Sequence, residues 1–115
     1  MTVSLTAKVK ELDVYHAQFA LGIGERLLPA HDELTATDFR KLLQMSHLST
    51  TQAAGCMRLA GDPDAQTFVQ FGLKKAVELT LLPRVARAAF LQSHDVMTMS
   101  ADALAAAVQY AAMTS

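Results

Sequence analysis

The sequence predicts an all-α protein, a small bundle of about five helices organised around one long central helix. Apolar residues recur three and four positions apart through most of the 115-residue chain, as they do on one face of a helix. Proline, glycine and helix-capping residues interrupt this pattern at only a few points. The length suits one domain, so residues 1–115 are expected to form a single all-helical domain.

The first helix is predicted from about Leu5 to Leu28, and Pro29 should end it. One side of this helix carries Leu5, Val9, Leu12, His16, Phe19 and Ile23. A second, flatter patch of small residues is made by Ala17, Ala20 and Gly24. Glycines inside a helix cost about 1 kcal/mol each relative to alanine. Gly22 and Gly24 therefore indicate either a close helix crossing or fraying toward Pro29.

Residues 29–34 (PAHDEL) are expected to form a polar connector to the second helix. His31, Asp32 and Glu33 are consecutive, and consecutive loop residues do not converge on one metal ion. The HxxxH and HExxH spacings of zinc sites are also missing from this stretch. We therefore expect a solvated loop here.

Two capping patterns predict where the next helices begin. Thr35 should cap a short second helix, with Asp38 in the third position. Ser49 and Gln52 form a better capping box for the third helix, which should end at Gly61. Near the C-terminus, Ser100 or Thr98 should cap the last helix, after a short polar linker.

The long central helix is predicted over residues 62–93. Asp62 should cap it and Pro63 should occupy its first position. Its apolar residues cover far more than one face, so it needs burial on most sides, in the bundle centre or at a dimer seam. Pro83 removes a backbone hydrogen bond at a cost of about 3 kcal/mol. The helix should therefore kink at Pro83 or break there and restart, and we favour one kinked or interrupted element over two separate helices.

The composition favours a protein partner. Charged residues make up 18% of the chain, against about 25% in a typical soluble domain. A small domain has much surface to cover, so this low charge predicts apolar surface that a partner buries, most simply in a homodimer. An alanine-rich monomer is the alternative. The expected interface lies on the central segment and comprises Phe68, Phe71, Leu73, Val77, Leu81, Leu82, Val85 and Phe90.

Enzymatic chemistry has no support in the sequence. The four histidines are scattered, and no residue pattern marks a nucleophile with a positioned base or a pair of carboxylates in a cleft. We therefore predict a non-enzyme without catalytic, metal or cofactor-binding residues. Cys56, the single cysteine, is expected to be a small buried hydrophobe in a reducing cytoplasm. Signal-peptide and transmembrane patterns are absent, so a cytoplasmic protein without membrane contact is predicted.

A helix-turn-helix DNA-binding regulator is the main alternative, because short helices follow one another between Phe39 and Phe71. The net charge of −1 and the acidic start at Asp62 and Asp64 disfavour phosphate contact, so no nucleic acid partner is expected. A structural subunit of a larger complex, with apolar helices completed by its neighbours, is another alternative. The favoured hypothesis is a regulator that binds a protein through apolar helix surface.

Two segments carry a resemblance to a known family: KVKELDVYHAQFALGIGERLLP in the first helix and FVQFGLKKAVELTLLPRVARAAFL in the central element. In size and helical pattern the chain resembles the small anti-activators of bacterial quorum sensing, the QslA-like proteins. The resemblance implies a cytoplasmic protein that sequesters a LuxR-type transcription activator and blocks its dimerisation or DNA binding. No binding residues carry over from it, because neither segment contains a diagnostic motif.

Overall fold

The computed structural model describes residues 4–114, and they are helical almost throughout, with no strand among them. The all-α prediction is confirmed, but this part of the chain forms seven α-helices and one short 3-10 helix rather than about five helices. In order they are α1 (Leu5–Glu33), α2 (Ala36–Met45), α3 (Thr50–Ala60), α4 (Ala65–Phe68), η1 (Val69–Phe71), α5 (Leu73–Leu79), α6 (Arg84–Ser93) and α7 (Ala101–Thr114).

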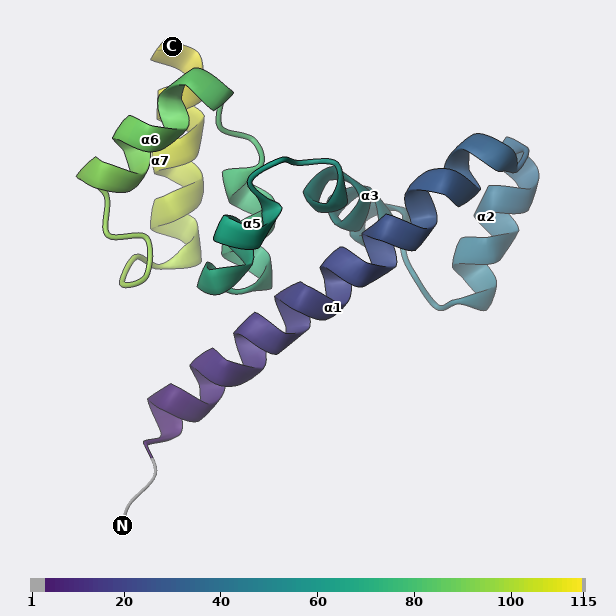
Figure 1. Ribbon diagram of the computed structural model, residues 1–115, viewed down its shortest axis with the longest axis horizontal. Coiled ribbons are helices and arrows are strands. Elements are labelled where there is room, and N and C mark those ends of the chain that lie inside the picture. Colours follow the sequence, from purple (N-terminus) through teal and green to yellow (C-terminus); the bar gives the residue numbers. More distant parts are fainter. Residues whose placement is uncertain (1–3, 115) are drawn as a thin grey trace.

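Helix α1 is the longest element, with 29 residues, and its N-terminal half extends away from the other helices (Figure 1). Its predicted end at Pro29 is wrong, because α1 continues through the expected connector to Glu33. The hydrogen bond that Pro29 cannot make would go to the carbonyl of Glu25, which lies on the exposed side of α1. The last turn is held by the Leu34 amide, which donates to the Ala30 carbonyl at 2.9 Å. The His31 ring also packs edge-on against Phe39 of α2.

The glycine in the small-residue patch of α1 marks a close crossing with α3, the first of the two interpretations. A Cβ on Gly24 would lie 2.0 Å from the Cys56 carbonyl oxygen and 2.8 Å from the Ala60 Cβ. The two helices therefore touch through backbone at this point, which only glycine permits.

Both predicted capping sites at α2 and α3 are confirmed. The Thr35 hydroxyl accepts from the Asp38 amide at 3.1 Å, and Ser49 and Gln52 form a complete capping box, with both hydrogen bonds at 3.0 Å. Helix α3 ends at Gly61 as expected, and Ser100 caps α7. These local patterns hold because each cap depends on residues only a few positions apart.

The predicted long helix over residues 62–93 is wrong, because this segment forms four short elements. Gly72 separates η1 from α5 with φ of 92°, a left-handed conformation that no α-helix contains. The break near Pro83 agrees with the sequence: α5 stops at Leu79, and Pro83 precedes α6. Asp62 does not cap a helix, since α4 begins at Ala65 without a side-chain cap.

The Asp62 carboxylate instead binds Arg87 of α6. Its two oxygens accept from the Arg87 guanidinium at 2.7 and 2.8 Å, and Asp64 accepts a further bond at 2.8 Å. Arg87 also donates to the carbonyls of Leu82 and Thr80, which the helix break leaves without helical partners, and lies over the Phe68 ring. Burial alone would lower the pKa of Arg87, but the hydrogen bonds and charges of Asp62 and Asp64 outweigh it and raise the pKa. This network fixes α6 against the corner between α3 and α4.

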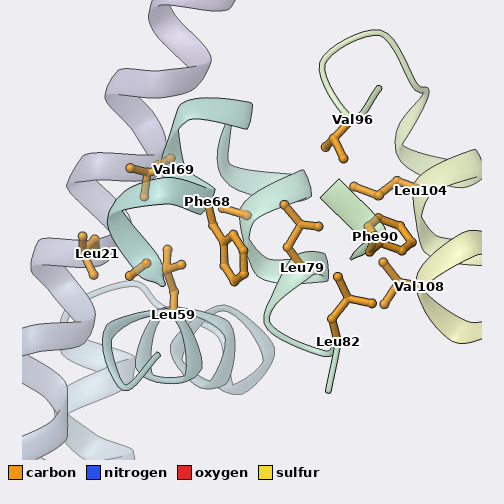
Figure 2. Close-up of a cluster of buried hydrophobic side chains, with 13 residues drawn as sticks. Leu21, Leu59, Phe68, Val69, Leu79, Leu82, Phe90, Val96, Leu104 and Val108 are labelled. Atoms are coloured by element: carbon orange, nitrogen blue, oxygen red, sulfur yellow. The ribbon is translucent and has the colours of Figure 1, made fainter. Parts of the chain in front are cut away.

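The larger core cluster surrounds Phe68, which is fully buried between Leu59 of α3 and Leu79 of α5 (Figure 2). The side chains of Phe90, Leu104 and Val108 extend the cluster to α6 and α7. A second cluster lies between α1, α2 and α3 and contains Leu27, Leu43, Ala53 and Cys56. The molecule is flat, measuring 46 × 44 × 21 Å, and its radius of gyration of 15.6 Å exceeds the roughly 13 Å expected for a rounded chain of this length. Within residues 4–114, no helix is both long enough and apolar enough to cross a membrane.

Candidate functional site

The apolar side of α1 lies on the surface. We call Leu5, Val9, Leu12, His16, Phe19 and Ile23 the α1 stripe. Four of its apolar side chains are widely exposed: Leu5 is 79% exposed, Val9 49%, Leu12 58% and Phe19 63%. The residues from Ser4 to Asp13 are all exposed, so no other element within residues 4–114 buries the first half of the stripe. A contiguous row of large apolar side chains in water is typical of a binding surface.

The second half of the stripe forms one wall of a groove. This open groove has a volume of 740 Å³ and lies between α1, α3, α5 and α7. Phe19 and Ile23 line it from α1. Leu48 contributes from the loop before α3, Gly55 from α3 and Val77 from α5. The apolar stripe and the apolar groove are therefore one continuous surface, because His16, Phe19 and Ile23 belong to both.

Charged side chains also line the groove, alongside the apolar ones. Lys74 and Glu78 contribute from α5, and Asp102 contributes from the first turn of α7. Lys75 also lines the groove, but its ammonium group donates to the carbonyls of Val96 and Met97 at 2.9 and 3.2 Å and so holds the loop before α7. A mostly apolar lining with a few charges of both signs matches the general composition of protein-binding surfaces.

The eight residues of the predicted interface do not form one surface. Phe68, Leu82 and Phe90 lie in the core, while Leu81 and Val85 are exposed. Phe71, Leu73 and Val77 are half-buried, and of these only Leu73 and Val77 reach the groove. The breaks at Gly72 and Pro83 turn the segment so that its apolar residues face several directions.

Sequence reasoning found the α1 stripe as one side of the first helix but placed the expected interface on the central segment instead. Its alternating spacing of four and three residues was the signal that could have identified it as a pairing surface. That spacing keeps apolar residues along a narrow seam, which is typical of a helix that packs against one other helix.

Cys56 is the buried hydrophobe that was predicted, and it lies at the base of the groove. Burial raises the pKa of its thiol, so the thiol stays protonated and weakly nucleophilic at neutral pH. Among the described residues, no group of three or more His, Cys, Asp or Glu side chains is arranged to hold a metal ion. His31 and Asp32 approach to 3.7 Å, but both are exposed.

No protein-family model, curated protein or solved structure matches the chain significantly. The proposal for function therefore rests on the residues of the α1 stripe and of the groove.

Proposed function

We propose that this chain is a non-enzymatic regulatory protein that binds another protein through the apolar surface of its helices. The observation that carries the proposal is the continuity of the exposed α1 stripe with the groove between α1, α3, α5 and α7. Leaving such a surface in water costs about 25 cal/mol for each Å² that a partner could cover. A partner helix with an apolar face could recover that free energy by packing into the groove.

A transcription activator is the partner class that we propose. The resemblance to quorum-sensing anti-activators implies a LuxR-type activator, and the groove has the apolar character that such a dimerising protein offers at its own subunit interface. Occupying that interface would keep the activator monomeric and away from its DNA.

The geometry gives less support to the helix-turn-helix alternative. The element that follows Asp62 is a four-residue helix, and its Ala65 and Phe68 are buried. Asp62 and Asp64, whose carboxylates would repel DNA phosphates, are bound to Arg87. A recognition helix needs an exposed face long enough to reach base edges in the major groove.

Site-specific photocrosslinking in the native host tests the proposal. A photoreactive amino acid at Thr51, which is exposed and lines the groove, should form a covalent adduct with a transcription activator, identified by mass spectrometry. The matched control is Ala54, which is exposed on the same helix but does not line the groove, and which should give no such adduct. An adduct with nucleic acid, or equal adducts at both positions, would overturn the proposal.

The effect on the activator can be measured with purified proteins. Adding the chain should convert the activator from dimer to monomer in size-exclusion chromatography with light scattering. Thr51→Arg fills the groove with a bulky cation and should weaken this effect at least tenfold, while Ala54→Arg should not change it. An activator that stays dimeric in a complex with the chain would contradict the blocking mechanism.

A further inference from the structure

We infer that the α1 stripe pairs with the α1 stripe of a second copy of this chain, parallel and in register, to form a two-stranded coiled coil. The stripe shares His16, Phe19 and Ile23 with the groove. The inference concerns self-association of the chain alone, and its test contains no activator, so its failure can be told apart from failure of the proposed function. It is carried by three features of α1: the spacing of the stripe, the residue types along it, and the residues that flank it.

The spacing of the stripe matches a coiled-coil heptad, in which the positions named a and d face the partner helix. Val9, His16 and Ile23 take the a positions, and Leu5, Leu12 and Phe19 take the d positions. In parallel coiled coils, β-branched residues at a with leucine at d favour two strands, and one polar residue at an a position fixes register. Val9 and Ile23 are the β-branched residues, Leu5 and Leu12 are the leucines, and His16 is the polar one.

The residues flanking the stripe fit a parallel partner. In a parallel pair, a residue at position g faces the residue five places further along the partner helix, at position e. Of the three such pairs in α1, only Lys8 with the second copy's Asp13 joins two exposed side chains, and their charges are opposite. Ala20 and Leu27, the other two e positions, are buried in the core of their own chain.

Gly22 supports the same arrangement independently. Unlike Gly24, it does not contact another helix of its own chain: the nearest side-chain atom to a Cβ there would be the end of Arg26, at 3.6 Å. At Gly22 a second helix would therefore meet only the flexible Arg26 side chain, which donates to the Gly22 carbonyl at 3.0 Å.

An antiparallel pair fits less well. In that orientation, e positions face e positions and g positions face g positions, which places Asp13 opposite Asp13 of the second copy. Like charges that face each other destabilise the pair. The charges on α1 therefore select the parallel orientation.

A charge exchange tests both the dimer and its orientation. Analytical ultracentrifugation of the purified full chain at low salt should give twice the 12.4 kDa chain mass. Lys8→Glu should raise the dimer dissociation constant about tenfold, because two attractive pairs become repulsive. The double variant Lys8→Glu/Asp13→Lys should restore it to within about threefold, since each surface pair contributes only modestly. Both side chains are exposed. Lys8 also lies 3.5 Å from Glu11 of its own helix, so a Glu11→Gln variant, which removes only this intrachain pair, is the control and should leave the dimer dissociation constant nearly unchanged.

A cysteine at the seam gives a second readout. In a Cys56→Ser background, Leu12→Cys places two thiols opposite each other only in the parallel, in-register pair, where an oxidant should link them rapidly. A chain that is monomeric at 100 µM overturns the inference. A dimer in which the double variant fails to recover and Leu12→Cys does not crosslink overturns the parallel arrangement.

Discussion

At the scale of single residues, glycine has opposite effects at two positions in the α1–α3 region. Gly24 lies where the backbones of α1 and α3 touch, so a methyl group there would overlap the Cys56 carbonyl. Gly55, on α3, has room for a methyl group, because the nearest atom to its Cβ position would be a Val77 methyl carbon at 3.5 Å. The same residue type is thus required at one position and only tolerated at the other.

Substituting alanine at each position should separate these roles. Gly24→Ala should lower the free energy of unfolding by about 2 kcal/mol or more, because α1 and α3 must move apart. Gly55→Ala should raise it by about 0.5–1 kcal/mol, because alanine lowers the entropy of the unfolded chain and favours helix. Urea unfolding followed by circular dichroism measures both, and a Gly24→Ala variant as stable as the parent would refute the close crossing.

At the scale of elements, the chain replaces one long helix with short pieces that Arg87 holds together. Thr80 to Pro83 interrupt the helix between α5 and α6, and the carbonyls of Thr80 and Leu82 accept hydrogen bonds from Arg87. The same guanidinium binds Asp62 and Asp64, at the corner that follows α3. Arg87 therefore connects the helix break to a corner whose carboxylates lie 25 and 23 residues before Arg87 in the chain.

The carboxylates of Asp62 and Asp64, which both bind Arg87, should contribute different amounts to the free energy of unfolding. Asp62→Asn should lower the free energy of unfolding by about 3 kcal/mol, because it leaves the buried Arg87 guanidinium without its bidentate partner. Asp64→Asn should cost at most about 1 kcal/mol, because the Asp64 side chain is 47% exposed and makes a single bond to Arg87. Thermal and urea unfolding of the two variants make the comparison. If both variants lose the same free energy of unfolding, the greater burial of Asp62 does not make its bond to Arg87 the more important one.

At the scale of the whole molecule, the flat shape leaves the first two turns of α1, up to Leu12, exposed and without support from the other described elements. Isolated helices of about ten residues are barely stable in water, because packing supplies most helix stability in proteins. The exposed half of α1 should therefore be well formed only when its stripe is covered by the proposed second copy.

Hydrogen exchange should detect this dependence. Backbone amides from Val9 to Tyr15 should exchange more slowly as the protein concentration rises from 1 to 100 µM, because dimerisation covers the stripe. Phe19→Glu places two carboxylates in the seam, so in this variant the same amides should exchange fast at every concentration. Amides of α3, such as that of Leu59, provide the internal control and should not respond. Strong protection of residues 9–15 at 1 µM would contradict this dependence.

The sequence by itself determined the helical class and the helix ends at Thr35, Ser49 and Gly61. The caps at Thr35 and Ser49 and the stop at Gly61 depend on contacts within one turn of helix, so residue type and spacing predict them. The spacing of the α1 stripe was equally visible, since it depends only on helix periodicity.

Only the tertiary structure decided where the long central segment breaks and which apolar faces are buried. Asp62 could cap a helix or bind Arg87, and the bond to Arg87 forms because folding brings α6 to that corner. Gly72 breaks the segment at a point where a side chain would meet Asp13 of α1, a contact between residues far apart in sequence. Both Phe68 and the α1 stripe show the apolar spacing of a helix face, yet Phe68 lies in the core and the stripe stays exposed. Sequence periodicity cannot separate the two cases, because burial depends on which elements meet in space.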